Sequence, residues 1–279
     1  NIKVAVWDNT SKITRYTAKT GTLPTNYSIN YYEGMTLGEM WGYKCDGLFQ
    51  SDEEAQTWAN YSKFTNRSAT WQAGDPRYLD LNGDGYVNNG NNTIYDHGDL
   101  VKIGNTTPRY SYSIQGGVRW NGIGISMMWQ GVGKRDWYPA KESGYFWGQY
   151  GRPYSMALPW HNSDRWSPTN RGAYWPRLVG YSASDSGLIL AQPNTRYVQD
   201  ASYIRLKNLT IDYNFPKELV NKIGLQALKI YVSGENLLTF SPLKKYAKNY
   251  DPEGIYAGDA DYGTNKFGSD NFGDGDGYP

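Results

Sequence analysis

The feature that most constrains this chain is a strict two-residue alternation of apolar and polar side chains through residues 109–133. The apolar positions before the central turn are Tyr110, Tyr112, Ile114, Val118 and Trp120, and those after it are Ile123, Ile125, Met127 and Trp129. The turn itself is Asn121-Gly122, the preferred pair for a two-residue hairpin of type I′. Strands of soluble proteins usually run to about five or six residues, whereas a tilted strand that crosses a bilayer needs about 9–11. The alternation therefore predicts two long antiparallel strands of membrane-spanning length, each with one apolar face.

Two later spans, 208–215 and 228–240, alternate in the same way, and 2–8 and 35–46 do so more weakly. Before the first of these, Ile204 and Leu206 stand on the opposite parity to Leu209 and Ile211. A β-bulge near Lys207, or a strand that continues above the bilayer, accounts for this change of parity. The fold class we expect is all-β: an antiparallel transmembrane barrel segment of about six strands. Six strands cannot close a barrel, since about eight is the lower limit.

The connections between these spans differ greatly in length. Residues 121–122 and 216–227 form short connections, whereas 47–108, 134–202 and 241–279 are long and rich in Gly, Asn, Asp, Trp and Tyr. Short turns at one end and long loops at the other are typical of outer-membrane barrels, in which the long loops are extracellular. The connection 10–34 is an exception, because it falls on the short side and is not short.

Composition supports a molecule that lies at a boundary between water and an apolar phase. Aromatic residues make up 16% of the chain, with 26 Tyr and 11 Trp against 7 Phe, and Tyr and Trp combine an apolar body with a polar tip. The formal net charge of +1 provides no global field that would select nucleic acid. No run of about 18 apolar residues is present, so a transmembrane helix is excluded. The single cysteine, Cys45, rules out an internal disulfide framework.

An acidic loop from Asp80 to Val87 matches the first half of an EF-hand calcium loop. Oxygen ligands come from alternate positions, a glycine permits the sharp turn, and a backbone carbonyl adds a further ligand. The residue at the twelfth position is Asn91, where a bidentate acid belongs, and two acids follow shortly after it. The candidate ligands of a structural Ca²⁺ are Asp80, Asn82, Asp84, Tyr86, Asp96 and Asp99. The alternative is a solvated Asx/Gly turn.

Several phrases, taken together and in order, resemble the C-terminal region of SusC/RagA-like TonB-dependent transporters of Bacteroidetes. They are Asp8–Thr14, Glu33–Gly38, Gly42–Gln50, Asp80–Gly85, Ile103–Pro108, Tyr203–Thr210 and Tyr231–Thr239. They extend over almost the whole chain, so the resemblance is specific for the family, although not for a cargo.

The resemblance implies late strands of a 22-stranded barrel that imports glycans or peptides across the outer membrane. It also implies a SusD-like surface lipoprotein as partner, an N-terminal plug, and TonB acting through that plug. Residues 1–279 would form a partial barrel, with the plug, the earlier strands and the closing strand outside this sequence, which stops at Tyr278-Pro279.

Residues 134–202 form an aromatic-rich loop with two possible roles. Its rings could stack on sugar cargo or contact a lid protein, or they could form the loop's own small core. We favour the core for most of them, because a loop near seventy residues must bury something. The candidate ligand-binding residues are Trp137, Tyr138, Trp147, Tyr150, Trp160, Trp166 and Trp175.

Catalysis has little support in the sequence. The two histidines, His97 and His161, are far apart and have no evident nucleophile, and a Gly-x-Ser-x-Gly elbow is absent. We therefore expect no enzyme. The main alternative to the transporter is a secreted, calcium-stabilised carbohydrate-binding β-sandwich, which would need short, evenly spaced strands. A glycan-degrading enzyme ranks last.

Overall fold

The computed structural model describes residues 1–24, 30–58, 71–140, 143–154, 157–184 and 188–255. The chain divides into two compact units. The strand unit comprises Asn1–Asn9, Pro108–Arg135 and Asp200–Pro242, and the loop unit comprises Thr10–Thr107, Asp136–Gln199 and Leu243–Pro279. The end of the chain, including Tyr278-Pro279, lies outside the described residues.

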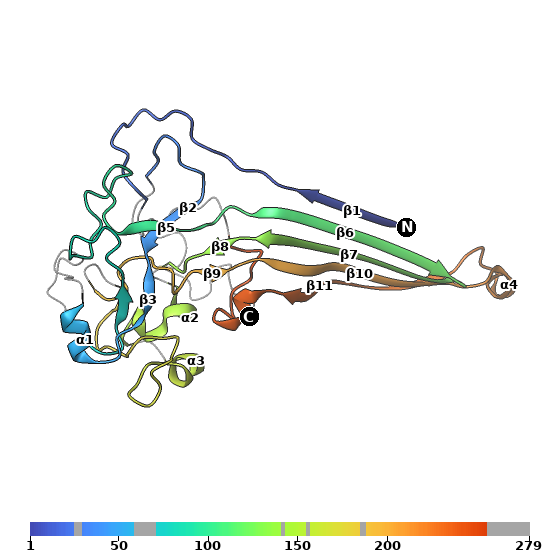
Figure 1. Ribbon diagram of the computed structural model, residues 1–279. Coiled ribbons are helices and arrows are strands. Elements are labelled where there is room, and N and C mark those ends of the chain that lie inside the picture. The colour runs from blue at the N-terminus through green and yellow to red at the C-terminus, as the bar shows by residue number, and fades with distance from the viewer. Residues whose placement is uncertain (25–29, 59–70, 141–142, 155–156, 185–187, 256–279) are drawn as a thin grey trace. The chain divides into compact units, whose positions relative to one another are not determined.

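The strand unit is one antiparallel sheet of five strands in the order β1-β6-β7-β10-β11. Figure 1 shows these strands running side by side, with β6 and β7 joined by the tight hairpin. Their bounds are β1 Ile2–Trp7, β6 Arg109–Trp120, β7 Ile123–Lys134, β10 Tyr203–Asn214 and β11 Lys229–Phe240. Four of the five have 12 residues, twice the usual length of a soluble strand.

The Asn121-Gly122 turn forms as the sequence predicts. Both residues have positive φ, 51° and 87°, which is the requirement of a type I′ hairpin. The turn fixes the register, so that Trp120 faces Ile123, Val118 faces Ile125, and Ile114 faces Trp129. The apolar side chains of the two strands therefore lie next to each other on the same face of the sheet.

A β-bulge keeps the apolar side chains of β10 on this same face along the whole strand. Ile211 and Leu209 pair with Ile125 and Met127, the register then shifts between Leu206 and Asn208, and Leu206 pairs with Trp129. The extra residue is Lys207. This extra residue brings the side chains of Ile204 and Leu206 onto the apolar face, as a β-bulge does. The first explanation of the parity change, a bulge near Lys207, is therefore confirmed.

The number of strands differs from expectation. Among the described residues the long sheet has five strands rather than about six, because residues 35–46 do not join it. They form β2 (Glu39–Tyr43), which pairs with β5 (Leu100–Asn105), and begin β3 (Cys45–Leu48), which pairs with β4 (Pro76–Tyr78). All five residues of β2 are buried, so its weak alternation does not mark a strand with one lipid-facing side. This also explains the connection 10–34, which is part of one long excursion from Thr10 to Thr107.

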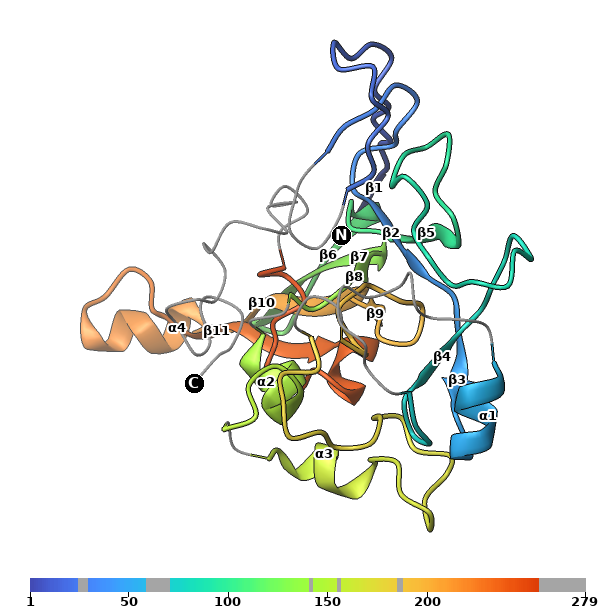
Figure 2. The same cartoon turned by 90° about the vertical axis from the view of Figure 1, so that its left-hand side faces the viewer.

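The loop unit contains short elements joined by irregular chain (Figure 2). Its helices are α1 Asp52–Thr57, α2 Gly144–Trp147 and α3 Pro159–Ser163, and a 3-10 turn covers Gly148–Tyr150. The short strands β8 (Asp136–Trp137) and β9 (Gln199–Asp200) pair with each other. Another short helix, α4 (Lys217–Val220), lies in the strand unit with the 3-10 turn Asn221–Ile223, and the 3-10 turn Pro242–Lys245 follows β11. None of the helices in the described ranges is long and apolar enough to cross a membrane.

The sheet generates a prediction about Ile125 and Ser126, which are neighbours on opposite faces of β7. An Ile125→Arg change places a charge among Val118 and Ile211, one row from the hairpin end of the apolar face. A cation on the lipid face costs roughly 2–4 kcal/mol of barrel stability at the midplane and about 0–1 kcal/mol near the interface, and we expect a cost between these limits. Ser126→Arg is the matched control and should be tolerated. Unfolding in lipid, followed by electrophoretic mobility, measures both variants, and equal tolerance of the two would refute the assignment of faces.

Candidate functional site

The face of the sheet opposite the apolar one is polar and hydrogen-bonded across strands. Thr210 and Ser233 lie 2.9 Å apart between their hydroxyl oxygens, on paired positions of β10 and β11. Arg205 donates from Nε to the Thr239 hydroxyl at 2.8 Å. Because neighbouring positions of a strand point to opposite faces, this polar face is the one that would line the interior of a barrel.

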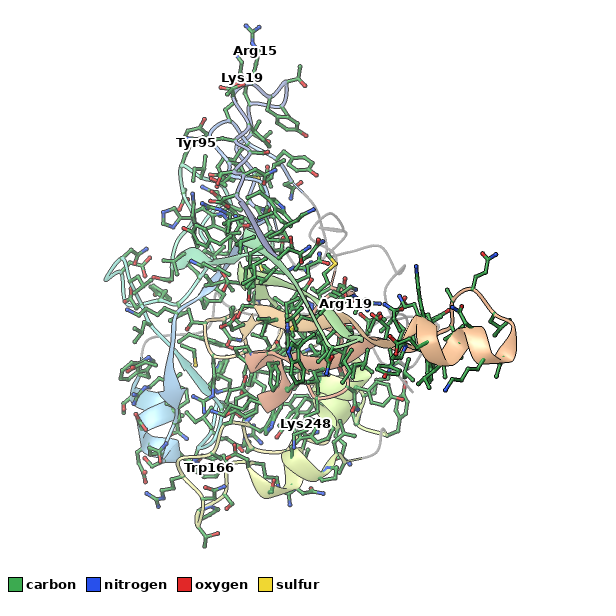
Figure 3. The ribbon with its side chains drawn as sticks, turned by 90° about the vertical axis from the view of Figure 1, so that its right-hand side faces the viewer. Arg15, Lys19, Tyr95, Arg119, Trp166 and Lys248 are labelled. Atoms are coloured by element: carbon green, nitrogen blue, oxygen red, sulfur yellow. The ribbon has the colours of Figure 1, made fainter. Side chains whose placement is uncertain are left out.

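A charged cluster lies on the polar face near the two short turns. Arg119 of β6 donates to Asp212 of β10 at 2.6 Å, and the Lys229 ammonium lies 3.6 Å from the same carboxylate. Arg119, at the end of β6, is labelled in Figure 3. The ion pair between Arg119 and Asp212 crosses over β7 at Gly124, which pairs with both residues. A Cβ at Gly124 would collide with the Asp212 carboxylate and the Arg119 guanidinium, so a glycine is what allows a contact between strands that are not neighbours.

The aromatic loop residues mostly form a core. Tyr138, Trp147, Tyr150 and Trp175 are all buried. Trp147 packs against Tyr197 at 5.3 Å between ring centroids, and Trp175 stacks on Tyr197 at 5.7 Å and on Tyr150 at 5.8 Å. Rings that are covered by other rings of the same unit are not accessible to a ligand. For these four, the structure agrees with the loop core that we favoured.

The other three candidates, Trp137, Trp160 and Trp166, are partly exposed. Trp137 packs on Tyr250 at 4.8 Å between centroids. The indole nitrogens of Trp160 and Trp166 are buried without a hydrogen-bond partner. These three residues remain the ligand-binding candidates within the aromatic-rich loop.

The two histidines each lie beside an aromatic ring. The His161 Nε2 is 2.7 Å from the Phe146 carbonyl oxygen, and its ring packs edge-on against Trp175 at 4.4 Å. Burial lowers the pKa of His161 to about 4, so the ring is neutral at physiological pH. His97 lies 5.6 Å from the Trp41 ring. Neither environment supplies a nucleophile.

The acidic loop adopts a compact turn around Asp80. The two carboxylate oxygens of Asp80 accept hydrogen bonds from the backbone N–H groups of Gly83 and Gly85, at 2.7 and 2.8 Å. The Asn82 side-chain oxygen accepts from the Asp84 N–H, and Asp84 accepts from the Tyr86 N–H. These are the local hydrogen bonds of consecutive Asx/Gly turns, the alternative to a calcium site.

The two remaining acids of the predicted set are engaged in other turns. Asp99 is fully buried and accepts backbone hydrogen bonds from Leu81, Asn82 and Asn88. Asp96 accepts from the Asn91 side chain. Within the described ranges, no group of three or more His, Cys, Asp or Glu side chains is arranged to hold a metal ion. Asp80, Asn82 and Asp84 are thus linked within one short turn, while Asp99 holds the backbone on both sides of that turn.

Sequence reasoning missed two buried charges that organise the loop unit. The Asp75 carboxylate is fully buried and receives two hydrogen bonds from Arg177, at 2.6 and 3.2 Å. Burial raises the pKa of Asp75 even with this partner beside it. Glu39 accepts from Lys102 and from the Tyr32 hydroxyl, and although burial opposes it, these hydrogen bonds lower the pKa of Glu39.

Known proteins resemble this chain in sequence and in structure. No family model matches the chain. The chain is 29% identical over 235 residues to the TonB-dependent receptor P3 of Formosa agariphila, an alignment that covers 84% of this chain and 20% of the relative. It is 28% identical over 198 residues to the TonB-dependent receptor P26 of the same organism, covering 70% and 17%. The chain therefore spans about a fifth of the length of these relatives.

Solved structures share the fold. A structure of the RagAB peptide transporter superposes with a TM-score of 0.55 at 17% identity, covering 92% of this chain and 25% of that one. The RagAB peptide importer in a closed-closed state gives a TM-score of 0.53 at 16% identity, covering 90% and 24%.

The long antiparallel strands with one apolar and one polar face define an all-β segment of a transmembrane barrel. Together with the relatives, they support the resemblance to SusC/RagA-like TonB-dependent transporters of the outer membrane, and the solved structures share the fold. The relatives are named receptors and the solved structures are of a transporter, names that agree with the expectation of no enzyme. The β-sandwich alternative needs short, evenly spaced strands and is wrong, because four strands of one sheet have 12 residues each.

The buried rings of the loop unit generate a second prediction. Trp147→Ala removes a side chain that is 1% exposed, and we expect it to destabilise the loop unit by about 3–5 kcal/mol, the usual cost of emptying a large aromatic site. Tyr154, which is 86% exposed, provides the control, since Tyr154→Ala should change stability little. Hydrogen exchange of loop amides measures both. Equal protection in the two variants would mean that Trp147 is not part of a core.

Proposed function

We propose that the protein imports oligosaccharides or peptides across the outer membrane, in a TonB-dependent manner and together with a SusD-like surface lipoprotein. The observation that carries the proposal is the two-faced sheet, with an apolar face for lipid and a hydrogen-bonded polar face for a barrel interior. The relatives are named TonB-dependent receptors, and the similar solved structures are of a peptide transporter and importer. These names support import, and the RagAB likeness favours testing peptides beside glycans.

The loop unit is the proposed region of first contact with cargo or with the lipoprotein. All five long strands connect to it at the ends Trp7, Arg109, Lys134, Tyr203 and Phe240, which antiparallel pairing places at one end of the sheet. Long connections at one end of a barrel are extracellular. Figure 3 shows Arg15 and Lys19 at the tip of the first connection, with Tyr95 on a neighbouring loop. These are candidate contacts with a partner, in addition to the partly exposed Trp137, Trp160 and Trp166.

The import proposal predicts the loss of one class of nutrient. Cells that lack the whole protein should fail to deplete either oligosaccharides or peptides from a mixed medium, and cells that lack TonB should show the same defect. Mass spectrometry of the medium measures both classes at once, and native mass spectrometry of the detergent-extracted particle tests for the lipoprotein. Unchanged depletion of both classes would contradict the proposal.

A structural Ca²⁺ is the proposed ligand of the acidic loop. The donors are the side-chain oxygens of Asp80, Asn82 and Asp84 and the carbonyl of Tyr86, which are the hard oxygen ligands that calcium prefers, at alternate positions. Each Asp80 carboxylate oxygen accepts a hydrogen bond from the loop backbone, and a carboxylate oxygen has a second lone pair to offer. The ion would supply rigidity to a long connection.

The calcium proposal predicts that chelation loosens the loop without unfolding the barrel. Addition of EDTA should increase proteolytic cleavage around Asp84, and Asp84→Asn should weaken the response to added Ca²⁺ because it removes one ligand charge. Asp46→Asn, an exposed acid outside the loop, is the control. Equal cleavage with and without EDTA would refute the calcium proposal.

A further inference from the structure

The connection between β10 and β11 is longer than a reversal of direction requires. The neighbouring hairpin turns in two residues, Asn121-Gly122, whereas Phe215–Leu228 contains α4, a 3-10 turn and Gly224 with a φ of 76°. We call residues 216–228 the terminal turn. Figure 1 shows α4 beyond the ends of the long strands, and Figure 2 shows it to one side of β11. The additional residues therefore form a surface and not merely a link.

That surface is apolar and unusually exposed. Leu219, Ile223 and Leu225 are 55%, 65% and 46% exposed, while Val220 is 2% exposed. Leu219 and Ile223 are four residues apart, a spacing that places them on the same side of a helical segment. Lys217 and Lys222 are exposed beside them. Three large aliphatic side chains within seven residues, with Lys217 before them and Lys222 between two of them, form an amphipathic surface of the kind that lies in a membrane interface.

The terminal turn lies at the level where the apolar face of the sheet ends. The last row of that face contains Trp120, Ile123, Tyr213 and Ile230 on four adjacent strands. Phe215 continues it and packs against Tyr213, with ring centroids 4.8 Å apart. A strand of 12 residues is about 40 Å long, and a tilt of about 40° reduces its height to about 30 Å, the thickness of the hydrocarbon core. The residues after Phe215 therefore begin at the headgroup region.

We propose that the terminal turn docks on the phospholipid leaflet at the short-turn end of the barrel. Leu219, Ile223 and Leu225 insert among the upper acyl chains, and the ammonium groups of Lys217 and Lys222 contact lipid phosphates. Lysine is suited to this position, because its stem covers apolar surface while its charge stays in the polar layer. The continuity of the exposed aliphatic side chains with the aromatic end row points to lipid rather than to a protein. The inference rests on the membrane setting of the sheet and does not depend on the proposed import.

Site-specific fluorescence in a bilayer tests whether the terminal turn inserts into lipid. On a Cys45→Ser background, Ile223→Cys or Glu218→Cys carries a polarity-sensitive fluorophore, and the whole protein is placed in nanodiscs with or without brominated phospholipid. Glu218 is the matched control, since on a helix it points about 140° away from Ile223. Heat-modified electrophoretic mobility confirms that each variant is folded.

The expected result is a blue-shifted emission at position 223 that brominated lipid quenches several-fold more than the emission at position 218. Equal quenching at the two positions, or a water-like emission at 223, would overturn the proposal. A blue-shifted emission at 223 that brominated lipid does not quench would overturn it in favour of a protein or a second copy as the covering partner.

Removing the charges of Lys217 and Lys222 tests whether these lysines contact lipid phosphates. A variant with Lys217→Gln and Lys222→Gln should lose the preference for phosphatidylglycerol over phosphatidylcholine that native mass spectrometry of retained lipids measures for the unchanged protein. Lys248→Gln, in the loop unit, is the control and should retain the preference. An unchanged preference in the double variant would refute the phosphate contact. Neither readout involves transport, so failure here is distinguishable from failure of the import proposal.

Discussion

The interaction on which this structure depends is the backbone ladder of the long sheet. In hydrocarbon, an unpaired N–H or C=O group costs several kcal/mol, so strands can cross a membrane only when each bonds to its neighbours. Register then becomes decisive, because a slip of one residue would move every apolar side chain to the other face. Two devices hold the register here. The left-handed pair Asn121-Gly122 sets it for β6 and β7, and the bulge at Lys207 corrects it along β10.

The loop unit meets the same need for burial in a different way. It has no long ladder among its described residues, and its strands have two to six residues. Its order comes from packed rings such as Trp147, Trp175 and Tyr197 and from buried charges with dedicated partners. The Asp75 carboxylate joins segments 102 residues apart through Arg177. A long loop built in this way has a defined surface, which recognition of a cargo or a partner requires.

Periodicity predicted the parts of the fold that depend on local rules. The hairpin, the four long strands and the bulge all follow from alternation and turn chemistry, which act over a few residues. The span 35–46 was misassigned because β2 is buried on both faces, and alternation carries no information there. The ion pair between Arg119 and Asp212 and that between Asp75 and Arg177 could not be predicted, since each joins residues about a hundred positions apart. The acidic loop was predictable as a turn, but Asp99 was expected as a ligand and instead braces the loop from below.

The edges of the long sheet show what its surroundings must provide. Among the described residues, β1 and β11 each pair on one side only, and both present apolar side chains such as Val4 and Val232 on the exposed face. A membrane tolerates no open edge, because nothing in hydrocarbon replaces water as a partner for the free backbone groups. Each of these strands therefore requires a neighbouring strand on its open side. The same argument applies to the polar face. Thr210, Ser233 and the Arg119–Asp212 pair are stable within a membrane only if closure of the sheet keeps lipid away from them.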